Sequence, residues 1–263
     1  MKTVVITGGT RGIGRGLALE LLKRGARVAI SGRNGATATK AAAELEAAAS
    51  APGRVIGVGC DASNFEQVQG LWDAAAAKFG RIDIWVNNAG ISAPRKPFTA
   101  QKPETMREVV DTNILGVMYA TSVAMAGMNK QGSGFIWNME GFGSGGQKQN
   151  GMAVYGLTKR AVTYFTESVA KELKDSKVGV GFLSPGIVTT ELLLGDYKDS
   201  PAEWERAKKI FNILGDKVET VTPFLAEGIL NTTKNGARVA WLTSGKAFAR
   251  FATAAFKKRD LFS

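Results

Sequence analysis

The sequence alternates short runs rich in β-branched residues with longer stretches of helical periodicity. The runs that predict strands cover residues 3–6, 27–31, 54–59, 82–87, 134–138, 177–183 and 237–242. Several of these runs are apolar on both faces, which is typical of strands covered by helices on each side. Because parallel neighbours need long crossover connections, the alternation predicts an α/β fold built on a doubly wound parallel sheet.

Helical patterns fill the intervals, at residues 12–24, 36–49, 65–79, 103–128, 155–174 and 223–232. No internal repeat or low-complexity linker divides the 263 residues, so we expect a single domain over residues 1–263. Residues 192–216 interrupt the alternation with a polar, helical insertion before the last strand. Late insertions of this kind often cover a binding site, and we expect this one to form a substrate lid.

Composition excludes several kinds of catalytic site. The chain has no His, which removes Ser-His-Asp hydrolases, HExxH zinc enzymes and His general bases. Its one Cys, Cys60, allows no internal disulfide and no cysteine-cluster metal site, and no metal is expected. Acid–base chemistry therefore has to use Asp, Glu, Lys, Tyr or a cofactor.

The net charge of +11 is compatible with nucleic acid, anionic lipid or a phosphorylated ligand. It lies at the two ends, because residues 1–33 hold seven basic residues and only Glu20, and residues 228–263 hold seven and only Asp260. No nucleic-acid reader motif is present, so nucleic acid is not an expected partner. The first strand pattern starts at residue 3 and no apolar run reaches the roughly 18 residues of a membrane span, so we expect a soluble, cytoplasmic protein without signal or transit peptide.

A glycine-rich turn joins the first predicted strand to the first predicted helix. Glycines at such a turn let the backbone approach a ligand phosphate, and the helix N-terminus adds free N–H groups and a positive dipole. A tight structural turn is the alternative interpretation. The turn has the spacing G-x3-G-x-G, and its predicted cofactor-binding positions are Gly8, Thr10, Arg11, Gly12, Ile13 and Gly14.

The residue after the second predicted strand bears on the choice between the two nicotinamide dinucleotides. In such folds an acidic side chain here binds the ribose 2′-OH of NAD, whereas an Arg accommodates the 2′-phosphate of NADP. The sequence has Arg33 at this place, and Arg11 lies in the glycine turn. The pattern favours NADPH (NADP+) as cofactor, with two solvated surface charges as the alternative.

Several motifs, taken in order, resemble those of the short-chain dehydrogenase/reductase family. They are residues 7–14, Asp61, Asn87-Asn88-Ala89-Gly90, Asn113, Tyr155-x-x-x-Lys159 and Pro185-Gly186-Ile187-Val188-Thr189-Thr190. The resemblance implies a Rossmann-type domain that binds a small-molecule substrate and assembles as a homodimer or homotetramer. It also implies further cofactor contacts, from Asp61, Ala62, Asn87, Ala89, Gly90, Tyr155, Lys159, Pro185, Gly186, Val188 and Thr190.

Tyr155 and Lys159 carry the predicted chemistry. They are four residues apart, so on a helix they share one face. A neighbouring ammonium stabilises phenolate and lowers the pKa of a phenol, which suits a chain without His. The resemblance implies that Tyr155 donates a proton to the substrate oxygen, that Lys159 tunes Tyr155 and holds the nicotinamide ribose, and that Asn113 supports a proton-relay water. A Tyr and a Lys on a solvated helix surface are the alternative.

One departure from the family pattern affects the catalytic set. The family has a Ser about 13 residues before the Tyr, but Phe142 and Gly141 lie 13 and 14 residues before Tyr155. Ser144, eleven residues before Tyr155, is the nearest hydroxyl, and we expect it to replace the missing Ser. Glu140 is an alternative donor if it is protonated.

The same region resembles the chlorophyll(ide) b reductase branch of the family, most clearly in Asn138-Met139-Glu140-Gly141 and Gly143-Ser144-Gly145-Gly146. The resemblance implies that NADPH reduces the 7-formyl group of chlorophyll(ide) b, or a related bulky tetrapyrrole aldehyde, to the alcohol. Two departures, the lack of a plastid-targeting extension and the polar segment Gln147-Lys148-Gln149-Asn150, suggest a bacterial relative of that branch. The alternatives are a broad-specificity aldehyde/ketone reductase and a non-catalytic NADP(H)-binding sensor or scaffold.

Residues 244–263 form a basic tail whose segment 246–259 has helical period. One face holds Phe248, Phe251, Ala252, Ala255 and Phe256, and the other holds Lys246, Arg250, Thr253 and Lys257. Such a helix can lie on an anionic membrane surface. The favoured interpretation is that its phenylalanines pack on the chain's own core or on a partner subunit.

Overall fold

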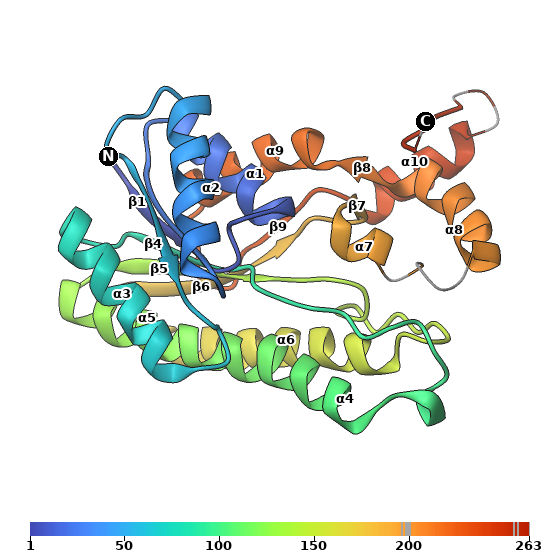
Figure 1. Cartoon of the computed structure of the whole chain (residues 1–263), viewed down its shortest axis with the longest axis horizontal. Helices are drawn as coiled ribbons and strands as arrows, with labels where there is room; N and C mark the ends of the chain where they lie inside the picture. Colours follow the sequence, from blue (N-terminus) through green and yellow to red (C-terminus); the bar gives the residue numbers. More distant parts are fainter. Residues whose placement is uncertain (196, 198–200, 255, 257, 263) are drawn as a thin grey trace.

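A computed structural model describes residues 1–195, 197, 201–254, 256 and 258–262. All seven strands of its main sheet are parallel, in the order β3-β2-β1-β4-β5-β6-β9 (Figure 1). The fold class predicted from the alternation is confirmed. The strands are β1 (Thr3–Ile6), β2 (Arg27–Gly32), β3 (Val55–Gly59), β4 (Ile84–Asn87), β5 (Gly134–Met139), β6 (Val178–Ser184) and β9 (Arg238–Ala240).

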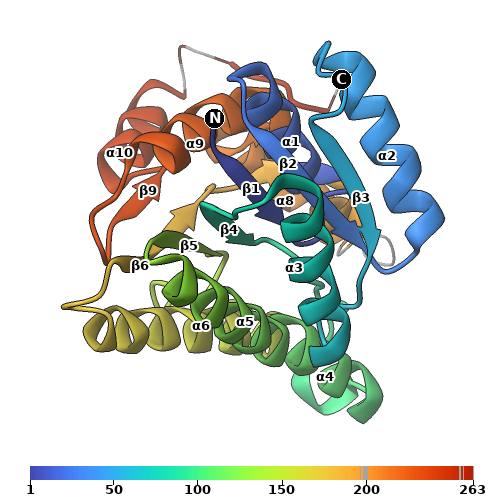
Figure 2. The ribbon, with the colours of Figure 1, turned by 90° about the vertical axis from the view of Figure 1, so that its left-hand side faces the viewer.

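Helices cover both faces of the sheet, as Figures 1 and 2 show. One layer packs through Leu17, Leu21 and Leu225, and the other through Trp72, Ala124 and Met128. The first layer contains α1 (Gly12–Lys23), α2 (Gly35–Ala48) and α9 (Val218–Asn231). The second contains α3 (Phe65–Phe79), α4 (Pro103–Val110), α5 (Gly116–Gln131) and α6 (Ala153–Glu172), with a 3-10 turn at Phe98–Ala100 before α4.

The predicted helix at residues 103–128 is one long helix with a local defect. A π-helical turn, Asp111–Leu115, joins α4 to α5. The combined segment Pro103–Gln131 is long and apolar enough to cross a membrane by length and composition alone. However, α5 packs on α3 and β5, with Ala124 and Met128 fully buried, so it is a core helix of this fold.

Helix α9 begins earlier than the sequence predicts. The prediction starts it at Pro223, but α9 begins at Val218 and contains Pro223 in its interior. Gly16 of α1 has no side chain, and a Cβ there would lie 2.5 Å from Val218 and 2.8 Å from Thr222. Packing of this first turn of α9 on α1 therefore outweighs the hydrogen bond that proline cannot donate.

The predicted insertion at residues 192–216 is mostly helical in its described part, with α7 (Glu191–Gly195) and α8 (Pro201–Leu214). Residues 196 and 198–200 lie outside the described residues. A two-residue parallel ladder closes its base, β7 (Val188–Thr189) with β8 (Asp216–Lys217). Tyr197 is 4% exposed and lies 4.5 Å under the Arg95 guanidinium, so the insertion contacts the loop after β4. Its role as a lid stays a prediction.

The basic tail contains α10 (Ser244–Thr253), but its phenylalanines do not pack on the chain's own core. Phe248, Phe251 and Phe256 are 76%, 49% and 89% exposed, so that part of the favoured interpretation is wrong. The physical reason is that the opposite face is occupied: Arg250 donates to the Asp216 carboxylate at 2.8 Å and to the Leu214 carbonyl. Ala255 and Lys257 lie outside the described residues.

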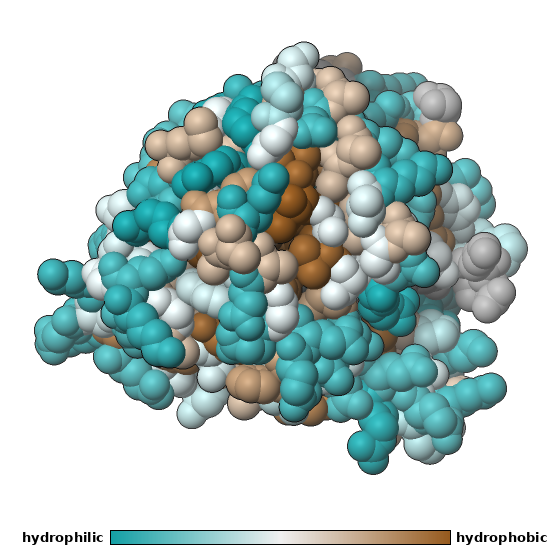
Figure 3. All heavy atoms as spheres, turned by 60° about the vertical axis from the view of Figure 1, so that its left-hand side comes forward, coloured by the Kyte–Doolittle hydropathy of each residue, from teal (hydrophilic) through white to brown (hydrophobic). Residues whose placement is uncertain are grey.

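The end of the molecule at which the strands begin is largely hydrophilic. In Figure 3, hydrophilic side chains cover most of this face, and a narrow strip of hydrophobic residues is visible near its centre. The residues identified from the sequence as site candidates belong instead to segments that follow the carboxyl ends of the strands.

A glycine in β3 offers a test of the close packing between β3 and α2. A Cβ at Gly57 would lie 2.0 Å from the Ala38 carbonyl oxygen, a backbone atom that cannot move away by itself. We expect Gly57→Val to lower the free energy of unfolding by about 3 kcal/mol or more, measured by urea denaturation. Gly70→Ala is the control, because nothing lies within 4 Å of its Cβ position, and it should not destabilise the protein. Equal stability of both variants would contradict this account of the packing.

Candidate active site

The strand order reverses between β1 and β4, and the glycine turn lies at the carboxyl end of β1 beside this point. In open α/β sheets a crevice forms outside the strands where the order reverses. The segment that follows β4 reaches into the same place, since a Cβ at Gly8 would lie 2.8 Å from the Cα of Ala89. The structure therefore brings the first and third predicted motifs together.

The backbone of the glycine turn is shaped for close approach. Gly8 and Gly12 have φ of +66° and +55°, in the left-handed region that side chains disfavour. A Cβ at Gly14 would lie 2.4 Å from both the Gly8 carbonyl oxygen and the Asn88 side chain. These contacts hold the turn tightly against the segment after β4, at the N-terminus of α1, where Ile13 also lies.

The N-terminus of α1 keeps its N–H groups available. Arg11 is the N-cap residue, no side chain caps the helix, and its first turn has no acidic residue. Such an end attracts an anion. Arg33 is exposed and makes no ion pair within the described part of the chain. Arg11 pairs with Glu191 at 2.7 Å, but both side chains are about 70% exposed (70% and 72%), so the pair is weak and exchangeable.

Two neighbouring asparagines have different positions, and only one was predicted as a cofactor contact. The Asn87 side chain is buried and hydrogen bonded to Thr121 and Asn138, so it joins strands and helices below the crevice. Asn88, which the sequence analysis missed, donates to the carbonyls of Thr7 and Gly8 at 2.9 Å each. A repeated amide next to a glycine turn is a signal that could have identified Asn88 as the residue that holds the turn.

The remaining predicted cofactor positions surround the same crevice. Thr10 packs on Gly32 at the end of β2, since a Cβ at Gly32 would lie 2.7 Å from its methyl group. Thr190 lies 3.5 Å from the Cβ position of Gly12, so the start of the insertion meets the glycine turn. Asp61 accepts hydrogen bonds from Ser63. The others are Ala62 and Val188, which are buried, Gly90, Pro185, and Gly186 with φ of +73°.

Asn113 lies in the π-helical turn and is fully buried. Its Oδ1 accepts from the Ile91 N–H at 2.9 Å, and its Nδ2 donates to the Ile91 carbonyl at 2.8 Å and to Thr158 at 3.1 Å. The extra residue of a π turn rotates a helix face, and such turns are frequent at functional sites. Asn113 therefore ties the loop after β4 to α6, the helix that carries the predicted Tyr–Lys pair.

Tyr155 and Lys159 lie on the first two turns of α6, and the Lys159 ammonium is 5.7 Å from the centre of the Tyr155 ring. Lys159 is 6% exposed and donates to the Met139 carbonyl at 3.2 Å. Burial lowers the pKa of Lys159 to about 8, and the charge of Glu140 acts in the opposite direction. The ammonium is therefore held next to the phenol by the end of β5.

The expectation that Ser144 replaces the missing Ser stays a prediction. The Ser144 hydroxyl is buried, accepts from the Gly141 N–H at 3.1 Å and donates to the Lys159 carbonyl at 3.4 Å, so it fixes the loop. Gly141 lies against the phenol, since a Cβ there would be 2.6 Å from the Tyr155 hydroxyl.

Glu140 is 7% exposed, and its ion-pair partner is 47% exposed. Its carboxylate accepts a hydrogen bond from Arg238 of β9 at 3.0 Å. Burial raises the pKa of Glu140, while Arg238 and a hydrogen bond from Ser184 favour the ionised form. An ion-paired carboxylate is a poor proton donor, so this geometry favours an electrostatic role toward Lys159 over the donor role considered from the sequence.

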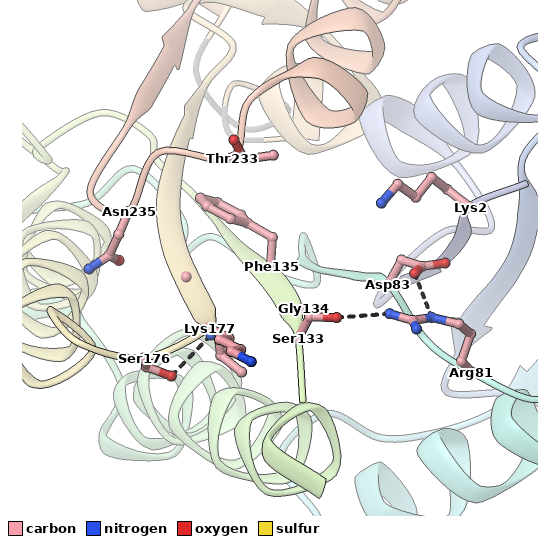
Figure 4. Close-up of a pocket in the computed structure, with 12 residues that line it drawn as sticks. Lys2, Arg81, Asp83, Ser133, Gly134, Phe135, Ser176, Lys177, Thr233 and Asn235 are labelled. Atoms are coloured by element: carbon pink, nitrogen blue, oxygen red, sulfur yellow. Dashed lines mark hydrogen bonds and ion pairs between the residues drawn. The ribbon is translucent and has the colours of Figure 1, made fainter. Parts of the chain in front are cut away.

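A separate cavity lies at the amino ends of β1, β5 and β6 and contains none of the predicted site residues (Figure 4). Its rim includes Lys2, Arg81 and Lys177. Arg81 donates to Asp83 at 2.7 Å and to Ser133 at 3.0 Å, and Asp83 accepts from the Thr3 N–H. These contacts tie the strand starts together. Among the described residues no group of three or more His, Cys, Asp or Glu side chains is arranged to hold a metal.

Residues 2–200 match the family described as short chain dehydrogenase. The chain is 35% identical to a probable chloroplast chlorophyll(ide) b reductase of Arabidopsis thaliana, over 99% of this chain and 54% of that protein. It is 37% identical to a chloroplast chlorophyll(ide) b reductase of Oryza sativa subsp. japonica, over 97% of this chain and 76% of that protein. The chain thus spans about half the length of the Arabidopsis relative.

Solved structures agree with the fold and differ in the cofactor they contain. ElxO with NADP bound has a TM-score of 0.77 and 29% identity, covering 93% of this chain and 98% of that chain. A 3-ketoacyl-(acyl-carrier-protein) reductase from Brucella melitensis, complexed with NADH, has a TM-score of 0.76 and 27% identity, covering 91% and 96%. Both nicotinamide dinucleotides are therefore represented among similar structures.

The buried charges predict a pH dependence. The pKa of Lys159 is about 8, so its ammonium is present below that pH and is lost as the pH rises through it. We expect any activity that uses this ammonium to fall above about pH 8. Glu140→Gln removes the negative charge that supports the ammonium, so the alkaline limb of the kcat/KM profile should move to lower pH by about one unit. Glu172→Gln, exposed on the same helix, is the control; an unmoved limb in Glu140→Gln would refute the coupling.

Proposed function

The chain belongs to the short-chain dehydrogenase family and is an oxidoreductase of that family, and from this we propose that it reduces a bulky, apolar aldehyde with NADPH. The proposed substrate is the 7-formyl group of chlorophyll(ide) b or a related tetrapyrrole, which becomes a hydroxymethyl group. The observation that carries the proposal is the Tyr155–Lys159 pair, held by Asn113 and by the end of β5, beside a crevice suited to a dinucleotide.

The residues of the crevice fit a dinucleotide with a 2′-phosphate. The glycines let the turn pack against the segment after β4, and the uncapped N-terminus of α1 would face the pyrophosphate. Arg33 follows β2, the place from which a side chain reaches the adenosine ribose. Its positive charge supports NADPH over NADH, since β2 has no acidic residue that would bind a ribose hydroxyl and no ion pair of Arg33 is present among the described residues.

The proposed reaction needs a hydride, which NADPH supplies when bound. Tyr155 donates its hydroxyl proton to the carbonyl oxygen of the substrate as the carbon is reduced, so the oxygen leaves as an alcohol. Lys159 stabilises the phenolate that results, because its ammonium lies over the phenol ring. Asn113 keeps the loop after β4 against α6, so the side chains of Asn113, Tyr155 and Lys159 keep their relative positions.

The loop after β5 lies close to the proposed proton donor. A Cβ at Gly141 would be 2.6 Å from the Tyr155 hydroxyl, so glycine at this position lets the loop pass next to the phenol. Leu192 and Leu194 of α7 are about 40% exposed (40% and 42%) and would give the proposed lid an apolar inner or rim surface.

The second candidate is a broad aldehyde/ketone reductase. The similarity to a 3-ketoacyl-(acyl-carrier-protein) reductase structure supports it, because that protein acts on a different carbonyl. A non-catalytic NADP(H) sensor is disfavoured by the buried Lys159, since a binding module needs no desolvated ammonium beside a phenol. We place the protein in the cytoplasm as part of the proposal.

We also propose that the chain assembles through α5 and α6. Met118, Leu157 and Tyr164 of these helices are 41%, 61% and 72% exposed, which is unusual for large apolar side chains on long helices. The two helices are neighbours on one face of the molecule (Figure 2). A homodimer that pairs them would bury these side chains, and a tetramer would need a second surface.

Turnover with chlorophyll(ide) b and NADPH is the direct test of the function. We expect NADPH oxidation together with the 7-hydroxymethyl product, identified by absorbance and mass. Tyr155→Phe should lower kcat by roughly 10²–10⁴, because it removes the proton donor without changing the ring. Unchanged turnover in this variant would refute the role of Tyr155. Turnover of small aldehydes but not of chlorophyll(ide) b would favour the second candidate.

The side chain of Arg33 is proposed to select NADPH over NADH. Arg33→Asp places a carboxylate where the 2′-phosphate would bind, so we expect the Kd for NADPH to rise by about tenfold or more while that for NADH changes little. Titration calorimetry with both nucleotides measures this ratio. Lys40→Asp, an exposed change on α2, serves as the charge control. An equal loss for both nucleotides in Arg33→Asp would refute the 2′-phosphate contact.

A further inference from the structure

Helix α10 presents its apolar face to solvent and its charged face to the protein. Phe248 and Phe251 of α10, and Phe256 just beyond it, are among the most exposed large hydrophobic side chains described. Arg250, on the other face, is 18% exposed and forms an ion pair with Asp216. An ordinary surface helix has the reverse arrangement. The three phenylalanines therefore need a partner to cover them.

The tail is held firmly enough to present this face in a fixed orientation. Thr243 caps α10 by accepting from the Lys246 N–H. After the helix, Arg259 donates to Asp216 at 2.6 Å, Phe262 packs edge-on against Trp204 of α8, with ring centroids 4.8 Å apart, and Leu261 donates to Asn212. Arg250 within α10 and Arg259 after it are thus both bound to Asp216, and the last described residues contact α8.

We propose that this phenylalanine face, Phe248, Phe251 and Phe256, docks on the surface of an anionic lipid membrane. One exposed basic side chain, Lys258, follows Phe256, whereas Lys246 lies over the Trp241 ring with its ammonium 3.0 Å from the ring centre. Asp260 is the only acidic residue of residues 228–263. Rings that enter the acyl boundary, with cations beside them at the phosphate level, are the arrangement of an interfacial helix.

Size and charge favour a membrane over a second copy of the chain. A helix of ten residues is about 15 Å long, and three rings offer on the order of a few hundred Å², less than the roughly 800 Å² that each partner of a stable dimer buries. A two-fold contact would also set the basic residues of one copy against those of the other. Neither the small area nor the repulsion between like charges applies to an anionic lipid surface.

The position of α10 connects docking to the entrance of the crevice. Helices α8 and α10 lie beside each other at the end of the molecule that also carries α7 (Figure 1). A docked molecule would therefore hold its insertion near the lipid, where an apolar substrate dissolves. This last step rests on the proposed function, whereas the docking surface itself does not.

Vesicle co-sedimentation of the full chain tests the docking surface without any turnover assay. Vesicles of phosphatidylcholine with phosphatidylglycerol should bind the protein, and vesicles of phosphatidylcholine alone should bind it more weakly. Phe248→Ser/Phe251→Ser should weaken binding by at least about tenfold. Phe248→Trp/Phe251→Trp should keep binding, because Trp also prefers the interface. Phe65→Ser, an exposed phenylalanine on α3, is the matched control.

Thermal melting checks that each variant is folded, so loss of binding is not loss of structure. The proposal is overturned if the wild type stays in the supernatant with both vesicles, if the double Ser variant binds as well as wild type, or if anionic lipid makes no difference. It is also overturned if light scattering shows that the double Ser variant lowers the mass of the assembly, since a second copy would then cover the face. Turnover of a soluble aldehyde, measured separately, reports on the proposed function alone.

Discussion

The close approach of two backbone segments where the strand order reverses is the constraint on which the site depends. Gly8 and Gly14 let the turn after β1 lie against the segment after β4, and Asn88 closes the contact by donating to the carbonyls of Thr7 and Gly8. Any side chain at these glycines would separate the two segments. Ile91 follows Asn88 by three residues in the same segment, and Asn113 binds its backbone. Since Asn113 also binds Thr158 of α6, the position of this segment determines the position of the Tyr155–Lys159 pair.

Burial of one ammonium then determines the chemistry. Lys159 is buried, and burial lowers its pKa to about 8 even though the charge of Glu140 acts in the opposite direction, so without that charge the pKa would be lower still. Glu140 supplies that charge, and Arg238 of the edge strand keeps Glu140 from becoming an uncompensated buried acid. The edge strand β9 therefore contributes to the site although it lies far from the glycine turn in the sheet order.

The sequence was sufficient to predict the features that depend on local pattern. The strands show as apolar runs, and the glycine turn and the Tyr155–Lys159 spacing depend on fixed geometry, so the structure places them on one crevice. The sequence was insufficient where tertiary packing determines the bounds of an element or the path of a loop. Gly16 admits the first turn of α9, so packing outweighs the presence of Pro223 in the helix, and the backbone of Gly141 in the loop after β5 lies against the phenol. The helical periodicity of the tail does not show that Arg250 binds the buried carboxylate of Asp216. The sequence pattern alone therefore could not predict which face of the tail helix is turned to the protein.

The Asp216 carboxylate connects the insertion to the C-terminal tail. Burial alone raises the pKa of this carboxyl, but hydrogen bonds from Arg250, Trp241 and Arg259 outweigh it and hold the pKa below its ordinary value. The carboxylate belongs to β8, at the base of the insertion, while its three donors follow the last strand of the sheet. Since a buried carboxylate keeps its charge only while its donors stay in place, the tail cannot leave the base of the insertion without exposing that charge to water or losing it. Whatever binds the phenylalanine face of the tail is thereby mechanically connected to the segment that would cover the crevice.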